Sequence, residues 1–177
     1  GEDGIVQPMP VDRHETSQFA HYIQTDATNR FAFVPHVADA NTIYQYLFDE
    51  TTGRLTPNDP PRVAQPPHTG PRHYCHHPVK DYVYADNEQG GSVTAYHLDP
   101  DHGTLEAFQT ISTLPNDFTE ENTCAQIHIH PEGRFLYASN RGHESIACFA
   151  INQDTGLLSL IGQVPAEGTP RAFNIDP

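Results

Sequence analysis

The chain repeats itself three times, and this repeat constrains its fold more than any other feature. Three segments align with one another, at residues 21–56, 72–106 and 125–159. Aromatic residues recur at intervals of 51 and 53 residues and glycines at intervals of 50 and 53, namely Phe31, Tyr82 and Phe135, and Gly53, Gly103 and Gly156. Such a period indicates an architecture built from repeated supersecondary units.

Each repeat is predicted to contain short β-strands. Aromatic-rich runs follow turns that carry Asn, Asp, Gly or Pro, at residues 31–34, 82–85 and 135–138. Runs with alternating apolar residues come next, at residues 42–48, 92–98 and 145–151. Polar turns then lead into a fourth strand, at residues 49–53, 99–103 and 152–156. Four antiparallel strands in each repeat predict an all-β fold made of propeller blades.

The number of repeats predicts a partial β-propeller of about three and a half blades, so that residues 1–177 form one partial domain. The expected blade units are residues 20–70, 71–123 and 124–168, followed by the opening strand of a further blade at 169–177. We also expect an N-terminal strand before the first blade. Closed propellers have typically four to eight blades, so we interpret the chain as a fragment of a larger ring. Closure of a complete small protein by dimerisation is the alternative.

Charge restricts the partners that this chain is expected to bind. It carries 23 acidic and 9 basic residues, which gives a formal charge of −14. Such a balance opposes binding to nucleic acids and to anionic membranes. No apolar run is long enough for a membrane span, and no signal peptide is visible. Lys80 is the only lysine beside eight arginines, so we expect arginine to meet any anionic small molecule. The oligomeric state stays open.

The cysteines favour a reducing compartment. Cys75, Cys124 and Cys148 are spaced neither as a disulfide framework nor as a thiol metal site. We therefore expect a cytoplasmic protein with small, packed cysteines and no cysteine nucleophile. The motifs of common serine hydrolases, nucleotide-binding loops and zinc proteases are absent from the sequence.

Charged residues recur at the head of the innermost strand of each predicted blade. The equivalent positions are His21, Arg72, Ala125 and Arg171. The alternative interpretation of each one is a strand end in contact with solvent or a side chain that bonds to backbone carbonyl groups. Two guanidinium groups about 6 Å apart in one cavity would repel by roughly 3 kcal/mol, unless a carboxylate or a bound anion lies between them. The pattern therefore favours an anionic ligand.

A second set of equivalent positions follows the second strand of each blade. It consists of Val37, Glu88 and Arg141, and asparagine precedes two of its members, at Asn87 and Asn140. A surface ion pair between Glu88 and Arg141 is one interpretation. The functional interpretation assigns proton transfer to His21 and Glu88. It assigns the binding of a carboxylate or phosphate to Arg72 and Arg141.

The twelve histidines raise the question of a metal site. His128 and His130 are expected on one face of a strand, with His76 and His77 in the preceding repeat. Adjacent strand residues point to opposite faces, so the spacing provides no set of three ligands. We predict neither a metal nor another cofactor.

Several motifs resemble the seven-bladed β-propeller lactonase family. They are GPRH at 70–73, NE at 87–88, STLPNDFTEENT at 112–123, IHIHPEGRFLYASNRGHESI at 127–146 and the terminal EGTPRAFNIDP. The family includes the propeller type of 6-phosphogluconolactonase and the fungal carboxy-cis,cis-muconate cyclase. The resemblance extends over nearly the whole chain, and SNRGH at 139–143 is its most specific part.

The resemblance implies a set of site residues. By motif, the active-site set proposed for the cyclase branch matches His21, Arg72, Glu88 and Arg141. Their neighbours are predicted to bind substrate, namely His73, Asn87, Asn140, His143 and Arg171. The implied activity is hydrolysis of a sugar lactone, foremost 6-phosphogluconolactone, a step of the pentose phosphate pathway in carbohydrate metabolism. The alternatives are a lactonizing isomerase of the muconate cyclase type and a non-catalytic propeller scaffold.

Overall fold

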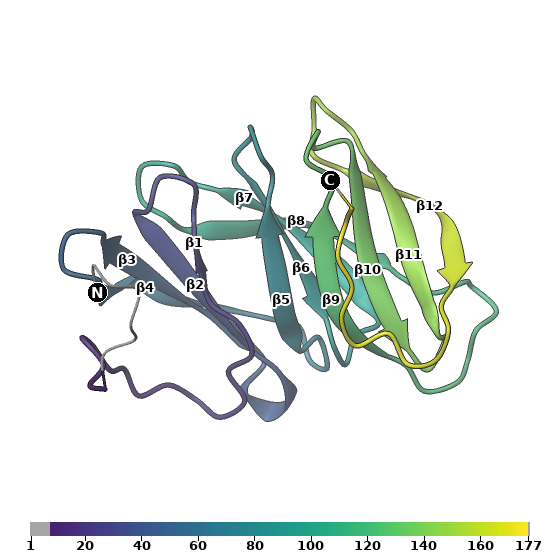
Figure 1. Ribbon diagram of the computed structural model, residues 1–177, viewed down its shortest axis with the longest axis horizontal. Coiled ribbons are helices and arrows are strands. Elements are labelled where there is room, and N and C mark those ends of the chain that lie inside the picture. Colours follow the sequence, from purple (N-terminus) through teal and green to yellow (C-terminus); the bar gives the residue numbers. More distant parts are fainter. Residues whose placement is uncertain (1–7, 177) are drawn as a thin grey trace.

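The computed structural model describes residues 8–176 and consists of three antiparallel sheets that lie side by side (Figure 1). The first sheet contains β1 (Gln24–Thr25), β2 (Phe31–His36), β3 (Thr42–Asp49) and β4 (Arg54–Ala64). The second contains β5 (Pro71–His76), β6 (Tyr82–Asn87), β7 (Ser92–Leu98) and β8 (Leu105–Ser112). The third contains β9 (Thr123–Ile129), β10 (Phe135–Arg141), β11 (Ser145–Ile151) and β12 (Leu158–Pro165). A short 3₁₀ helix, η1 (Ala38–Ala40), connects β2 to β3.

The predicted all-β blade fold is confirmed. In every sheet the strands pair in chain order, so each is a four-stranded meander. The strands expected from the aromatic runs lie within β2, β6 and β10, and those expected from alternation lie within β3, β7 and β11. Within residues 8–176, no helix reaches the length and apolar character needed to cross a membrane.

Two predicted strands are not found. Residues 169–176 form no strand, so the prediction of an opening strand at 169–177 is wrong for the part described here, and Pro177 lies outside it. A strand forms where a neighbouring strand supplies backbone hydrogen bonds. No strand within residues 8–176 pairs with residues 169–176. The expected N-terminal strand is also absent from residues 8–19, while residues 1–7 lie outside the described part.

Two hydrophobic cores hold the three sheets together. The first core lies between the first and second sheets and includes Phe33, Ile43 and Tyr96. The second lies between the second and third sheets and includes Tyr84 and Phe149. Because both faces of the middle sheet are covered, most residues of β6 and β7 are buried. Burial of these aromatic and aliphatic side chains fixes the sheets against one another.

A bulge recurs in the innermost strand of each sheet. Between β5 and β6 the register shifts by one residue, so that Arg72 and His73 both oppose Asp86. The same shift between β9 and β10 places two residues of β9 opposite Ser139. In the first sheet a register shift of one residue lies between the Ala20–His36 bridge and the pairing of β1 with β2. A bulge bends its strand and redirects its side chains, and here it lies at the position where the site residues occur.

Candidate active site

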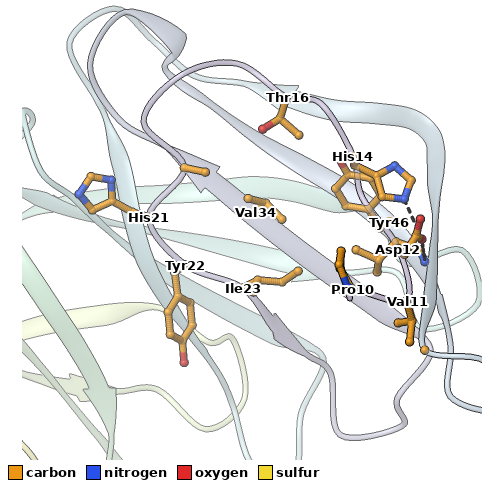
Figure 2. Close-up of a pocket in the computed structure, with 13 residues that line it drawn as sticks. Pro10, Val11, Asp12, His14, Thr16, His21, Tyr22, Ile23, Val34 and Tyr46 are labelled. Atoms are coloured by element: carbon orange, nitrogen blue, oxygen red, sulfur yellow. Dashed lines mark hydrogen bonds and ion pairs between the residues drawn. The ribbon is translucent and has the colours of Figure 1, made fainter. Parts of the chain in front are cut away.

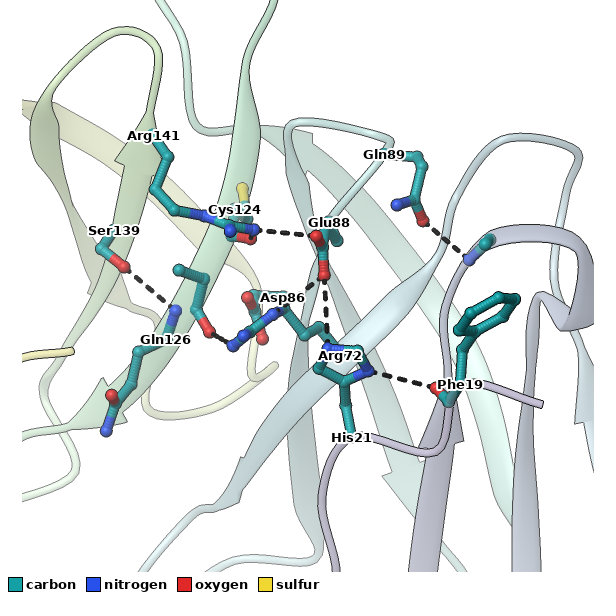
Figure 3. A network of polar contacts seen from close by, with 12 residues as sticks. Phe19, His21, Arg72, Asp86, Glu88, Gln89, Cys124, Gln126, Ser139 and Arg141 are labelled. Atoms are coloured by element: carbon teal, nitrogen blue, oxygen red, sulfur yellow. Dashed lines mark hydrogen bonds and ion pairs between the residues drawn. The ribbon is translucent and has the colours of Figure 1, made fainter. Parts of the chain in front are cut away.

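Four predicted site residues meet where the inner strands of the three sheets converge (Figure 3). His21 and Arg72 come from the bulged segments of the first and second sheets. Glu88 directly follows β6, and Arg141 ends β10. The structure therefore brings together residues that are far apart in the sequence, as the repeat predicted.

Glu88 joins the two arginines. Its Oε2 accepts a hydrogen bond from Nε of Arg72 at 2.9 Å, and its Oε1 accepts one from Nη2 of Arg141, also at 2.9 Å. The side chain of Glu88 is 16% exposed, so this is a partly buried ion-pair network. The sequence led us to expect either a carboxylate or a bound anion between guanidinium groups, and the structure places a carboxylate there. Two guanidinium groups against one carboxylate still leave an excess of positive charge.

Arg72 is the more enclosed of the two arginines. Its side chain is 5% exposed, against 14% for that of Arg141. Besides Glu88, its guanidinium donates to the carbonyl oxygen of Ala125 and, at 3.2 Å, to Nε2 of His73. Burial lowers the pKa of Arg72, and the charge of Glu88 acts in the opposite direction. The contacts of Arg72 are therefore made chiefly with the protein itself.

Within residues 8–176, only one ring nitrogen of His21 makes a hydrogen bond. Its Nδ1 lies 3.1 Å from the carbonyl oxygen of Phe19, an acceptor that requires the proton to be on Nδ1 in the neutral ring. The Nε2 atom then carries the lone pair and lies 3.9 Å from Oε2 of Glu88. This side chain is 26% exposed, so its free nitrogen is within reach of water.

His73 is a neutral neighbour of this cluster. Since arginine only donates, the contact with Arg72 makes Nε2 of His73 the acceptor. Burial, together with the positive charge of Arg72, lowers the pKa of His73 to about 4. Its ring lies 4.8 Å from that of Tyr22, between centroids, which fixes its orientation.

Asn87 and Asn140, which the sequence predicts to bind substrate, are both fully buried, and their amides bond to the protein itself. The amide of Asn87 donates to Ser92 Oγ and Thr94 Oγ1, each at 2.9 Å. Asn140 accepts from Thr113 Oγ1 at 2.7 Å. Through these bonds the two amides hold the backbone that carries the neighbouring residues Glu88 and Arg141.

His143 and Arg171 lie apart from the central ion-pair network. Nδ1 of His143 lies 2.7 Å from Ser145 Oγ, and its ring packs edge-on against Phe118. These contacts explain its position in the loop between β10 and β11. Arg171 is exposed in the irregular segment after β12. Its positive charge contributes to lowering the pKa of Arg72. Arg171 therefore adds positive potential to the site.

Two of the cavities formed by residues 8–176 are relevant to the cluster. The smaller of these two, about 320 Å³, lies between β5 and β9, and polar side chains contribute much of its lining, among them Tyr22, Gln24, His73, Gln126 and His128. The larger one, about 860 Å³, lies between residues 10–23 and the first sheet and is mainly apolar. Figure 2 shows His21 at one end of the residues that line this larger cavity.

Two further predictions concern the cysteines as nucleophiles and the histidines as metal ligands. Cys75, Cys124 and Cys148 are free, and burial raises the pKa of each thiol. A thiol held protonated in this way is a poor nucleophile. Residues 8–176 contain no cluster of three or more groups suited to a metal ion.

Sequence reasoning missed three residues that border the site. They are Tyr22 and Gln126, which line the smaller cavity, and Asp86, which is fully buried behind Arg72. Tyr22, His73 and Gln126 are equivalent in the repeat and follow the positions of His21, Arg72 and Ala125. Extending the repeat alignment by one residue would have found Tyr22 and Gln126, but not Asp86.

Comparison with known proteins agrees with this geometry. The family model described as "Lactonase, 7-bladed beta-propeller" matches residues 5–177. The chain belongs to this lactonase family. The resemblance seen in its motifs is thereby confirmed, and the three sheets are blades of the family's propeller.

Individual relatives of this lactonase-family chain are similar over about half of their own length. A 6-phosphogluconolactonase of Pectobacterium carotovorum is 36% identical over an alignment of 177 positions, which covers 99% of this chain and 52% of that protein. A Lactobacillus plantarum protein superposes with a TM-score of 0.81 at 29% identity, covering 89% of this chain and 45% of the other. The periplasmic gluconolactonase of Pseudomonas aeruginosa gives a TM-score of 0.78 at 27% identity, over 85% and 42%.

Proposed function

We propose that this protein is a lactonase that hydrolyses a sugar δ-lactone, with 6-phosphogluconolactone as its substrate. The observation that carries the proposal is the arrangement of Glu88 between two arginines, with the free Nε2 of His21 beside it. Lactone hydrolysis needs a base for water and a cation for the carbonyl oxygen. The names of the Pectobacterium and Pseudomonas relatives support the same class of reaction.

In this proposal His21 is the general base. Its Nε2 takes a proton from water while the water oxygen attacks the lactone carbonyl carbon, and the negative charge of Glu88 stabilises the imidazolium that forms. When the tetrahedral intermediate collapses, the ring C–O bond breaks, and the imidazolium returns its proton to the leaving alkoxide. The products are the open-chain acid and a neutral His21.

Arg141 is proposed to stabilise the oxyanion. Arg72 donates to Glu88, Ala125 and His73, whereas the donors of Arg141 with partners inside residues 8–176 all lie on Nη2. Nη1 of Arg141 therefore has N–H bonds to offer to a developing negative charge, and its side chain is 14% exposed against 5% for that of Arg72, so a ligand reaches it more easily. A preorganised donor of this kind supplies a large part of catalysis in acyl transfer.

The lining of the smaller cavity supports the proposal that the substrate carries several hydroxyl groups. Its polar lining comes from glutamine, tyrosine and histidine side chains, including His73, which is neutral at physiological pH. Such groups both donate and accept hydrogen bonds, as sugar hydroxyls do. A carboxymuconate has three carboxylates and no hydroxyl, so this lining favours the sugar lactone over the cyclase substrate. Arg171 then provides charge for a phosphate group.

We also propose that the protein acts in the cytoplasm, in the pentose phosphate pathway. Three free cysteines support a reducing compartment. The periplasmic Pseudomonas gluconolactonase shows that relatives with this fold also work elsewhere. A reporter that is active only in the cytoplasm, fused to a terminus of the full-length protein, tests this part of the proposal. We expect this reporter to be active.

The test of activity is acid release from 6-phosphogluconolactone by the full-length protein, measured against spontaneous hydrolysis. We expect clear acceleration by the protein and a loss of roughly 10²- to 10⁴-fold in kcat for His21→Ala, the usual contribution of a general base. His102→Ala is the matched control, because the side chain of His102 is exposed and bonds to Asp99 of its own turn, away from Glu88. Turnover of a carboxymuconate in place of the lactone would support the cyclase alternative, and turnover of neither would support a scaffold.

A further inference from the structure

Asp86 is a buried carboxyl group that the proposed chemistry does not use. It lies on β6 with no exposed surface, opposite the bulge that contains Arg72 and His73. Its Oδ1 accepts a hydrogen bond from the backbone N–H of His73 at 2.8 Å. Its Oδ2 is buried and has no hydrogen-bond partner within residues 8–176. Because burial of an unpartnered carboxylate oxygen is unfavourable, this group needs an explanation.

The third sheet shows what the bulge itself requires. Ser139 is equivalent to Asp86, and its Oγ accepts the backbone N–H of Gln126 at 3.0 Å. A neutral hydroxyl is therefore enough to satisfy the amide that the bulge releases. The carboxyl group of Asp86 does the same and adds an ionisable group behind Arg72, as Figure 3 shows. The charge of Asp86 must have some other effect.

Several charged and titratable groups face Asp86 from the elements around it. Arg72 lies on β5 and favours the charged carboxylate, whereas Glu88 at the end of β6 opposes it. The thiols of Cys75 on β5 and Cys124 on β9 also lie within range. On β7 the residue paired with Asp86 is Val93, which does not titrate. Arg72 is therefore the positive group that Asp86 can influence.

We propose that Asp86 is a positioning residue that supports the bulge carrying Arg72 and reduces the positive potential of Arg72 toward ligands, so that the site binds anions more tightly when Asp86 is protonated. The inference deepens the proposed function and rests on it for the identity of the natural ligand. It concerns anion binding and not the chemical step.

The surroundings of Asp86 place this change near neutral pH. Complete burial raises its pKa to about 7, although the hydrogen bond from His73 and the charge of Arg72 act in the opposite direction. Below this pH the carboxyl group is neutral, and Glu88 alone compensates Arg72. Above this pH, the charged carboxylate of Asp86 also compensates Arg72. An anionic substrate would then bind less tightly as the pH rises.

Sulfate is a suitable probe, because its charge is constant between about pH 6 and pH 8, unlike that of phosphate. We expect Asp86→Asn and wild type to bind sulfate about equally near pH 6. Near pH 8 we expect Asp86→Asn to bind it roughly fivefold more tightly, which is about half of the roughly tenfold effect of the fully charged carboxylate. The other ionisable groups are the same in both proteins, so the ratio of their dissociation constants, measured by calorimetry on the full-length protein, reports Asp86.

Asp86→Ser is the second variant, since it copies Ser139 and keeps an acceptor for the bulge. We expect it to behave like Asp86→Asn in sulfate binding. A ratio that stays at one over the whole pH range for both variants would show that Asp86 only supports the backbone, and the proposal would be wrong. Retention of the wild-type circular dichroism spectrum shows that a variant is folded.

A measurement on the wild type decides the question if neither variant folds. Linkage requires that sulfate raise the apparent pKa of Asp86 by about one unit when Asp86 changes sulfate affinity tenfold. Infrared titration of the protonated carboxyl band, with and without sulfate, detects this shift, and its absence overturns the proposal. Neither experiment uses a lactone, so a failure here differs from a failure of the proposed activity.

Discussion

The Nε2 atom of His21 lies 3.9 Å from Oε2 of Glu88 and thereby links the first blade to the second. The same carboxylate accepts hydrogen bonds from arginines of the second and third blades. One side chain therefore connects all three blades at the axis. This dependence on Glu88 leads to the first prediction.

Glu88→Gln is expected to damage both stability and activity. The substitution keeps the shape of the side chain but removes the negative charge that both Arg72 and Arg141 contact. Removing one partner of a buried ion pair costs several kcal/mol, and the partial exposure of this one reduces the loss to roughly 2–3 kcal/mol. Urea unfolding measures the first effect and lactone turnover the second. Glu106→Gln on the exposed face of β8 is the control, and an equal effect there would contradict the assignment.

The two arginines are predicted to respond differently to lysine. Arg141→Lys should lower kcat by about 10²-fold with little loss of stability, because it removes the proposed donor to the oxyanion. Arg72→Lys should lower the free energy of unfolding by about 2 kcal/mol, because a lysine cannot reproduce its donors to Glu88, Ala125 and His73. Steady-state kinetics combined with urea unfolding separate these outcomes. Identical profiles for the two variants would argue against separate roles.

Asn140→Ala is predicted to affect folding and not KM. The amide is fully buried and bonded to Thr113, Asn122 and Ser145, so its loss leaves buried groups without partners at a cost of roughly 2–3 kcal/mol. The melting temperature should fall, while KM of the remaining folded protein stays unchanged. Asn116→Ala in an exposed loop is the control. A large rise in KM would restore the substrate-binding interpretation.

The contrast between Asn140 and its neighbour Arg141 shows what the sequence could predict. The repeat aligns equivalent residues of each blade, so the sequence alone was enough to place His21, Arg72, Glu88 and Arg141 together. Alignment gives the position of a residue in the blade but not its depth. Asn140 and Arg141 are the last two residues of β10, and only the pleat of this strand decides that Asn140 points inward and Arg141 toward the axis.

The bulges and the chain ends were beyond sequence reasoning for a different reason. A one-residue register shift leaves no strong signature in a strand of mixed residues, although it determines where Arg72 and Asp86 face. The predicted strand at 169–177 has the sequence of an innermost strand. It is irregular over residues 169–176 because strand formation depends on a partner and not on composition alone.

Gly103→Ala is expected to destabilise the interface between the first two blades. Gly103 has φ of +68° in the turn after β7, and a Cβ atom there would collide with the ring of Phe31. Strain and overpacking together should cost roughly 2–4 kcal/mol. Gly168→Ala is the matched control, since Gly168 has φ of +71° but open space around the added carbon. Thermal unfolding should show a clearly smaller loss for Gly168→Ala, and equal losses would show that only the backbone conformation matters.

Asp86 predicts a pH dependence of stability whose sign follows from its burial. Its pKa is about 7 in the folded protein and near 3.8 when the group is freely hydrated, so the folded state holds this proton more tightly. Its contribution to stability is therefore fully present below about pH 4 and is lost as the pH rises through about 7. Each pKa unit corresponds to about 1.4 kcal/mol, so the loss amounts to a few kcal/mol. Asp86→Asn cannot titrate, and its free energy of unfolding relative to wild type should rise over this range. Urea unfolding of both proteins at several pH values tests this, and a constant difference between them would show that Asp86 does not titrate in the folded state.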